Sequence, residues 1–261
     1  MLHGWCGMKE AWGPLPEALA AAGLRAVAVD LPGWGRTPPV GRRRHAADDY
    51  AGALAPLARR LGPLAVVGHS MGAQPAVTLA ARVPAVRSLV LIAPPAVRVG
   101  RIALPPRNLT ELVSLPGIGV PAARLALLAM KLRRPPPVER YRRTVADLAT
   151  LERPEAAALI RAAEHAFRRT ATATMARAWR SAARTDLRGP ARELHQPTLI
   201  VVGERDRIVH PAESLSLARA LPDARLVRVP DCGHLPHLER PDLTVPVIVR
   251  HVRAHARDAT G

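Results

Sequence analysis

The stretch from Val66 to Gly72 (VVGHSMG) decides the fold of this chain. A short apolar run, Leu64 to Gly68, leads directly into it, and an alanine-rich run typical of a helix follows. The pattern G-x-S-x-G between a buried strand and a helix indicates a nucleophile elbow, a sharp turn that exposes a serine hydroxyl. Gly68 and Gly72 supply the missing side chains that let strand and helix approach so closely. The sequence therefore predicts a nucleophilic Ser70; the alternative is a serine in an ordinary strand-to-helix turn.

Further apolar runs and alanine-rich stretches alternate on either side of this turn. We expect buried strands at Leu24 to Asp30, Leu64 to Gly68, Arg87 to Ile92, Pro197 to Gly203 and Ala224 to Val229. We expect crossover helices at Trp12 to Ala22, Asp48 to Leu61, Gln74 to Arg82 and Pro211 to Leu221. This alternation predicts an α/β fold, with a mostly parallel central sheet and helices on both faces.

The stretch from about residue 95 to 190 breaks this rhythm, because it has no clear strand and several prolines. Leu125, Leu128 and Leu132 recur at spacings of three and four, which predicts an amphipathic helix. Met175, Ala178, Trp179 and Ala182 repeat the same spacing further on. We therefore expect a core formed by residues 1–94 and 191–261, with residues 95–190 inserted as a helical lid.

A nucleophilic serine needs a base, and the base needs an orienting carboxylate. Asp206 follows one expected strand, in the sequence GERD, and His234 follows the next, in DCGH. Both would lie at the carboxyl ends of parallel strands, where such sheets present their functional loops. The chain order Ser70, Asp206, His234 is the order expected for this class of sheet.

Other residues compete for these two roles. The reserve for the base is His237, while His69 should point away from Ser70. The remaining histidines lie in helices or loops without a matched acid: His45, His165, His195, His210, His251 and His255. Glu204 and Asp231 compete with Asp206 for the acid.

Acyl transfer also needs hydrogen-bond donors for the negatively charged oxygen that develops during the reaction. The backbone N–H of Met71, the residue after the nucleophile, would be one donor. The second would be the backbone N–H of Trp5, in a loop at the chain start that His3 and Gly4 would shape.

Composition excludes several classes of protein. The chain has 261 residues, 48% hydrophobic and 23% charged, which is typical of a globular domain. The net charge of +17 invites a nucleic-acid function. However, Lys9 and Lys131 are the only lysines, aromatic residues make up 3%, and no nucleic-acid motif occurs, so we expect no nucleic-acid partner.

The cellular setting follows from what the sequence does not contain. No stretch is apolar enough to span a membrane, and the first ten residues lack a signal-peptide core. Cys6 and Cys232 have no zinc-type spacing, so we expect reduced thiols. We therefore expect a cytoplasmic protein with no membrane span and no metal site. The oligomeric state is left open.

Together these motifs resemble the α/β-hydrolase fold superfamily. They are LHGW at 2–5, DLPGWGRT at 30–37, GHSMG at 68–72, GERD at 203–206 and GH at 233–234. The resemblance implies a serine triad, no metal and no organic cofactor. Relatives that dehalogenate or open epoxides carry aspartate at the elbow, so Ser70 argues against both reactions.

The resemblance does not fix the substrate, because esterases, lactonases and carbon-carbon bond hydrolases share the fold. We expect a serine hydrolase that acts on a small-molecule carboxylic ester or related acyl substrate. The alternatives are a carbon-carbon bond hydrolase of ring-fission dienoates with the same triad, and a non-catalytic ligand-binding member of the fold.

Two features of the expected lid have more than one interpretation. Residues 133–188 hold thirteen arginines against six acidic residues, which is either a solvated helical surface or a field that attracts anionic substrates. Phe167, Met175 and Trp179 could line an acyl pocket or form the core of the lid.

The chain start departs from the family pattern. The family has two or three strands before the HG motif, whereas only Met1 and Leu2 precede His3. Three strands with their turns need about 20 residues. We therefore expect that the assigned start omits coding sequence; the alternative is that the chain is a fragment. The chain beginning at Met1 should be only marginally stable, because neighbouring backbone groups lose their partners.

Overall fold

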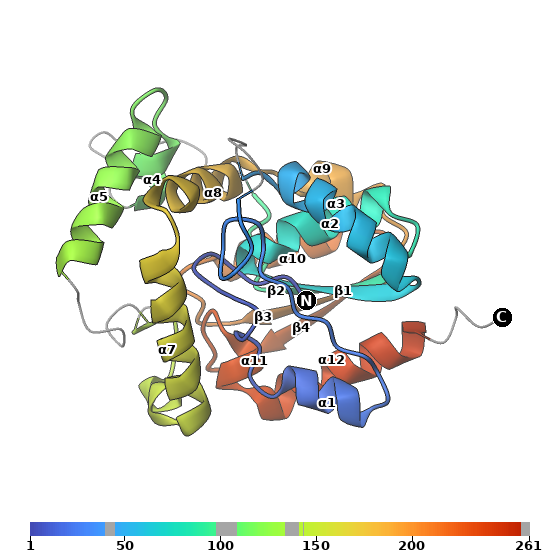
Figure 1. The fold of residues 1–261 in the computed structure, drawn as a ribbon. Helices are drawn as coiled ribbons and strands as arrows, with labels where there is room; N and C mark the ends of the chain where they lie inside the picture. The colour runs from blue at the N-terminus through green and yellow to red at the C-terminus, as the bar shows by residue number, and fades with distance from the viewer. Residues whose placement is uncertain (40–44, 98–108, 134–140, 143, 257–261) are drawn as a thin grey trace.

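A four-stranded parallel sheet forms the centre of the molecule in a computed structural model, which describes residues 1–39, 45–97, 109–133, 141–142 and 144–256 (Figure 1). The strands lie in the order β1-β2-β3-β4. They are β1 (Leu64–His69), β2 (Val86–Ile92), β3 (Thr198–Gly203) and β4 (Ala224–Val229). Four of the five expected strands are therefore confirmed to within a residue, together with the α/β class.

The two central strands are buried on both faces, as their continuous apolar runs predict. Every residue of β3 is buried, and in β2 only Arg87 is exposed. The expectation of a fully buried last strand is wrong, because β4 lies at the edge of the sheet and only Val229 in it is buried. Arg225 and Arg228 on this strand face solvent, where an edge strand tolerates charge.

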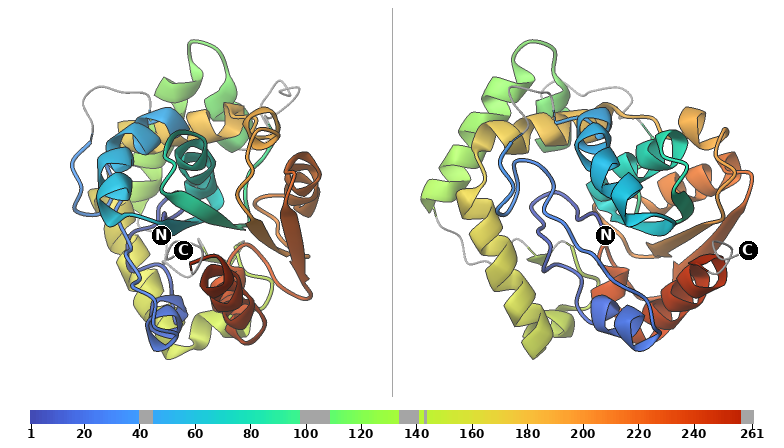
Figure 2. Two further views of the ribbon diagram at one scale, coloured as in Figure 1. Left: turned by 90° about the vertical axis from the view of Figure 1, so that its right-hand side faces the viewer. Right: turned by 45° about the vertical axis from the view of Figure 1, so that its right-hand side comes forward.

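Helices cover both faces of the sheet (Figures 1 and 2). The larger core cluster lies on the face covered by α2 (Ala47–Leu61), α3 (Ala73–Arg82) and α10 (Pro211–Ala220). The second cluster lies on the opposite face, under α1 (Leu15–Ala21) and α12 (Pro241–Ala256), with α11 (Pro236–Glu239) beside them. The expected crossover helices are confirmed, although α1 begins at Leu15 rather than at Trp12.

The stretch between β2 and β3 is helical. Its elements are α4 (Leu109–Ser114), α5 (Gly119–Arg133), η2 (Leu148–Glu152), α7 (Pro154–Arg169), α8 (Thr172–Arg184) and α9 (Arg188–Ala191). A bond from the Leu187 N–H to the Ala96 carbonyl (3.0 Å) joins its two ends. Figure 1 shows α4, α5 and α7 to one side of the sheet. The division at residues 95 and 190 stays a prediction, and parts of that range lie outside the described residues.

The leucine stripe of α5 faces outward. Leu125, Leu128 and Leu132 are 69%, 46% and 74% exposed, whereas Ala123 and Leu127 on the opposite side are buried. One face of the helix is therefore buried and the other is exposed, although both faces carry leucine. Among the described residues, no helix combines the length and the apolar character that a membrane span requires.

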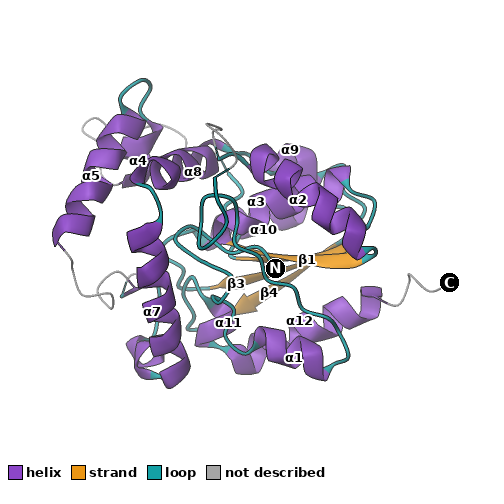
Figure 3. Cartoon of the chain, in the orientation of Figure 1, coloured by secondary structure: helices purple, strands orange, loops and turns teal. Residues whose placement is uncertain are grey.

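The expected strand from Leu24 to Asp30 is not formed. This segment, which follows α1, is drawn as a loop (Figure 3). Within the described residues its ladder contact is an isolated parallel bridge between Val29 and Leu2. Leu2 also bridges Gly68 of β1, so the first two residues lie between that segment and the sheet. A strand needs a continuous neighbour, and two residues supply only one step of a ladder.

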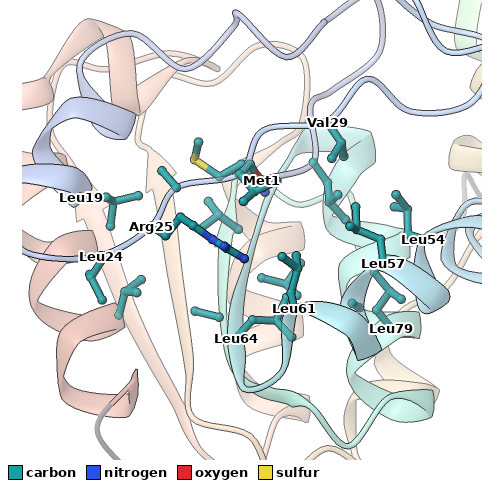
Figure 4. Close-up of a pocket in the computed structure, with 18 of the residues that line it drawn as sticks. Met1, Leu19, Leu24, Arg25, Val29, Leu54, Leu57, Leu61, Leu64 and Leu79 are labelled. Carbon is teal, nitrogen blue, oxygen red and sulfur yellow. Dashed lines mark hydrogen bonds between the residues drawn. The ribbon is translucent and has the colours of Figure 1, made fainter.

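A cavity of about 450 Å³ lies beside β1, next to these first residues (Figure 4). It is lined mainly by apolar side chains, among them Leu19, Leu24, Leu54, Leu57, Leu61 and Leu64. The Leu64 N–H bonds to Ala85 on the β2 side, so by the alternation of a parallel ladder Ala65 and Val67 direct their backbone groups toward the cavity side. There the Val67 carbonyl accepts the Leu2 N–H (2.8 Å).

The amino terminus of Met1 is buried at the end of this cavity. Its nitrogen donates to the Val27 carbonyl (2.7 Å), and burial lowers the pKa of the amine to about 5. Burial disfavours the charged ammonium, so the amine is neutral at pH 7.

Candidate active site

Ser70 lies at the sharp turn between β1 and α3, in the short 3₁₀ helix η1 (Ser70–Gly72). Its backbone has φ of +51°, a left-handed conformation that non-glycine residues rarely adopt. The turn depends on glycine, because a Cβ on Gly68 would lie 2.6 Å from the Gly72 carbonyl oxygen. The local sequence thus produces the strained strand-to-helix turn that is typical of a nucleophilic serine.

The structure brings the three predicted triad residues together. Nε2 of His234 lies 2.9 Å from the Ser70 hydroxyl, and Nδ1 lies 2.7 Å from Oδ2 of Asp206. All three residues are buried, and the serine is 9% exposed. With the proton on Nδ1 donated to the carboxylate, Nε2 is free to accept the serine proton.

Asp206 is fixed by the loop that follows β3. Its Oδ1 accepts the backbone N–H groups of Ile208 (2.8 Å) and Val209 (3.0 Å), and its Oδ2 is left for His234. Both carboxylate oxygens are therefore occupied, so the aspartate has one orientation and directs the imidazole toward the serine.

The competing acids lie outside this arrangement. Glu204 pairs with Arg228 at 3.0 Å, and Asp231 pairs with Arg205 at 2.5 Å. These four side chains are between 38% and 67% exposed, so solvent screens their ion pairs.

The two nearby histidines hold backbone groups rather than the serine. His69 donates from Nε2 to the main-chain carbonyl of His234 (2.9 Å), and His237 donates from Nε2 to the Ala11 carbonyl (3.2 Å). Burial lowers the pKa of both, that of His237 to about 4, so both are neutral at pH 7.

The loop at the chain start lies directly against Ser70. A Cβ on Gly4 would lie 3.1 Å from the Cβ of Ser70. His3 donates from Nδ1 to the Gly4 carbonyl (2.8 Å) and accepts the Leu31 N–H on Nε2 (3.0 Å). Burial lowers the pKa of His3 to about 4, so it stays neutral in this role. The oxyanion role of the Trp5 and Met71 N–H groups stays a prediction.

The inserted helices contact this loop through tryptophan. The Trp5 and Trp179 rings lie 4.3 Å apart at nearly a right angle, and the Trp5 indole N–H donates to the Met175 carbonyl (2.9 Å). Met175 and Phe167 are buried in the larger core cluster, whereas Trp179 is only partly buried against it. Of the three residues considered for an acyl pocket, Met175 contacts the loop beside Ser70 through its carbonyl oxygen and Trp179 contacts it through its ring.

Sequence reasoning missed Glu239, a buried carboxylate whose oxygens bind the backbone on both sides of His234. Its position five residues after the histidine, at the end of a short helix, is the only signal that could have indicated it.

The site contains neither a metal cluster nor a disulfide within the described part of the chain. No group of three or more His, Cys, Asp or Glu residues there has the arrangement of a metal site. Within the described residues Cys6 and Cys232 form no disulfide, and burial raises the pKa of Cys232.

The sequence matches the model of the alpha/beta hydrolase family over residues 1–247. The chain belongs to this family. It is 33% identical to a pimeloyl-[acyl-carrier protein] methyl ester esterase of Aromatoleum aromaticum, over 93% of this chain and 92% of the relative. It is also 28% identical to a 2-hydroxy-6-oxononadienedioate/2-hydroxy-6-oxononatrienedioate hydrolase 2 of Pseudomonas putida, over 90% of this chain and 80% of the relative.

Solved structures show the same fold. A thermophilic esterase from Thermogutta terrifontis superposes with a TM-score of 0.75, covering 97% of this chain and 88% of the other at 24% identity. The family and its relatives make this chain a hydrolase, which excludes the non-catalytic alternative.

Proposed function

We propose that this hydrolase cleaves carboxylic esters through an acyl-enzyme, with Ser70 as nucleophile, His234 as base and Asp206 as the orienting acid. The observation that carries the proposal is the continuous pair of hydrogen bonds from Asp206 through His234 to the Ser70 hydroxyl. A serine hydroxyl becomes a useful nucleophile at neutral pH only beside such a base.

In the first half of the reaction, the Ser70 oxygen forms a bond to the ester carbonyl carbon while His234 accepts the serine proton. The Trp5 and Met71 N–H groups would stabilise the oxyanion. The bond to the leaving alkoxide then breaks, and His234 returns the proton to it, releasing the alcohol. In the second half, water attacks the acyl carbon while its proton passes to His234. The bond from the acyl carbon to the Ser70 oxygen then breaks, His234 returns the proton to that oxygen, and the carboxylic acid is released. These steps require no cofactor.

We further propose that the substrate is the methyl ester of an acyl chain. The support is the relative from Aromatoleum aromaticum, which aligns with nearly all of this chain and is named for that activity. The arginine surplus of residues 133–188 would favour an anionic substrate or carrier, because clustered positive charge raises the local concentration of anions. Residues 95–190 would act as the lid over the site.

A second candidate is the hydrolysis of a carbon-carbon bond in a ring-fission dienoate, with the same three residues. The similarity to the Pseudomonas putida hydrolase favours it, at lower identity and with a smaller share of the relative covered. The anionic character of such a substrate would also suit the arginine-rich insertion.

The test compares three substrates on the purified chain: a p-nitrophenyl ester, a methyl ester with the same acyl group, and a ring-fission dienoate. A fluorophosphonate probe titrates the reactive serine. We expect labelling of Ser70, hydrolysis of both esters, and a far lower kcat/KM for the dienoate. A dienoate preference would move the proposal to carbon-carbon cleavage, and absence of both labelling and turnover would refute the serine mechanism.

A further inference from the structure

The loop that carries His234 is held at each of three consecutive backbone N–H groups. The N–H groups of Gly233 and Leu235 each donate to the carboxylate of Glu239 at 3.0 Å. The N–H of His234 itself donates to the Thr144 carbonyl at 2.7 Å. A loop residue normally leaves such groups to water. This loop therefore has an unusual number of internal restraints on the residue that faces Ser70.

Glu239 supplies two of these three restraints and extends them to a second segment. Its Oε1 accepts the N–H of Leu235, and its Oε2 accepts both Gly233 and Ala146, the latter at 2.7 Å. The residue is 2% exposed. Hydrogen bonds to a charged acceptor are stronger than neutral ones, and more so away from water. One carboxylate thus joins the His234 loop to the segment at residues 144–146, within the inserted region.

The packing at this junction leaves no room for adjustment. A Cβ on Gly233 would lie 2.6 Å from the Thr144 carbonyl oxygen and 2.7 Å from the Ala146 nitrogen. The backbone of the His234 loop is therefore in direct contact with residues 144–146.

We infer that Glu239 is a positioning residue for the base: it holds the backbone on both sides of His234, so that the imidazole stays aligned with the Ser70 hydroxyl. The inference rests on the proposed function. Glu239 does not touch the reacting atoms; it acts through the loop. Because an ångström of misalignment is enough to slow a proton transfer greatly, the effect on catalysis exceeds the effect on folding.

The substitution Glu239→Gln tests the need for a carboxylate. An amide of the same shape has one accepting oxygen and one donating NH₂ group. The oxygen can replace Oε2 toward Gly233 and Ala146, but the NH₂ then faces the Leu235 N–H, donor against donor. In the reverse orientation, the NH₂ group faces two donors, the N–H groups of Gly233 and Ala146. Either arrangement displaces the loop without leaving a large cavity.

The readout is a leaving-group comparison on two butanoate esters. The p-nitrophenolate leaves without a proton, whereas methoxide needs the proton that His234 returns. The ratio of kcat/KM for the methyl ester to that for the p-nitrophenyl ester therefore reports how well His234 reaches the leaving group. Rates are divided by the number of sites titrated with a fluorophosphonate, so that unfolded protein does not count.

We expect Glu239→Gln to lower kcat/KM for the methyl ester at least about tenfold more than for the p-nitrophenyl ester. The matched control is Glu213→Gln, which alters a half-buried carboxylate that also binds two backbone N–H groups, those of Ala96 and Val97 at 3.1 Å. The control should change both rates by the same factor, because that loop does not carry the base.

Equal losses for the two esters in Glu239→Gln would overturn the inference, since they indicate a general structural role. If that variant is insoluble, the same ratio measured on Glu239→Asp decides, because the shorter side chain cannot reach both loops. Failure of the proposed function looks different: the unmodified chain would then hydrolyse neither ester and would not be labelled.

Discussion

The two ends of β1 differ in how well they are hydrogen-bonded to, and packed against, the neighbouring segments. At its carboxyl end, the strand leads into Ser70, and the neighbouring loops are joined to it by short hydrogen bonds through His234 and His69. Toward its amino end, Ala65 borders a cavity of about 450 Å³, and the bridge from Leu2 reaches β1 at Gly68, near its carboxyl end. The carboxyl end of the strand is thus joined to its neighbouring loops by hydrogen bonds, whereas its amino end is incompletely packed.

This difference separates two requirements of the fold. The site needs a few loops at the carboxyl ends of the strands, and each can be held locally by backbone and side-chain bonds. The sheet needs a continuous neighbour along each buried edge, and no local bond replaces it. We therefore expect changes at the carboxyl end to alter catalysis, and changes at the cavity to alter stability.

The largest effect should follow from Ser70→Ala. It removes the nucleophile, so hydrolysis of a short-chain p-nitrophenyl ester should fall by several orders of magnitude. Because the change deletes a single oxygen, the thermal midpoint should stay within a few degrees. A p-nitrophenyl ester assay measures the activity, and thermal unfolding measures the midpoint. More than a few per cent residual activity in a folded variant would show that another residue is the nucleophile.

Asp206→Asn should have the next largest effect, a loss in kcat of about 10² to 10⁴, because an amide favours the wrong tautomer of His234. Glu204→Gln is the matched control on the same loop. Its side chain pairs with Arg228 near solvent, so activity should change less than about twofold. Steady-state kinetics on the two variants checks the ranking, and the opposite ranking would move the acid to Glu204.

Acid should lower the stability of the folded chain, because it contains buried histidines that are neutral. Burial lowers the pKa of His3 and His237 to about 4. Their unfolded value is about 6.5, so between pH 6.5 and 4 the unfolded state binds more protons than the folded one. Stability is then lost as pH falls through this window, by about 1–2 kcal/mol per histidine at pH 5.

Urea unfolding at pH 7.5, 6 and 5 measures this loss. In His237→Gln the dependence on pH should be shallower, since one buried group is removed. In His195→Gln, where the side chain is exposed, it should be unchanged. If the free energy of unfolding depended equally on pH in the unmodified chain and in both variants, a role for the buried histidines would be contradicted.

The smallest expected effect concerns the cavity. A designed extension of about six alternating valine and threonine residues before Met1 should pair with β1 and raise the thermal midpoint by several degrees. It also replaces a buried amine by an amide N–H at the Val27 carbonyl. An extension of equal length with proline at alternate positions cannot pair in this way and is the control. The same rise with both extensions would show that strand pairing is not the cause.

The residues of the proposed triad could be predicted from the sequence because each is determined locally. Ser70 lies in a turn that its own glycines define, and Asp206 and His234 lie in the loops that follow two runs with strand character. The parallel arrangement then brings the ends of these strands to one edge. Their distances, 2.7 and 2.9 Å, required the structure.

Local pattern failed where a neighbour decides the outcome. Leu24 to Asp30 reads as a strand, yet it forms one bridge, because a strand exists only with a partner along its length. The leucines of α5 have helical spacing, which determines that they share a face but not whether that face is covered.

The sequence by itself determined the family, the α/β class and the order of the three catalytic candidates, because motifs of a few residues encode turns and strand ends. Only the tertiary structure decided that Glu239 holds the loop of His234, that His69 binds its carbonyl, and that Leu2 lies between β1 and Val29. These contacts join segments whose separation in the sequence carries no periodic signal, so they arise only when the chain is packed.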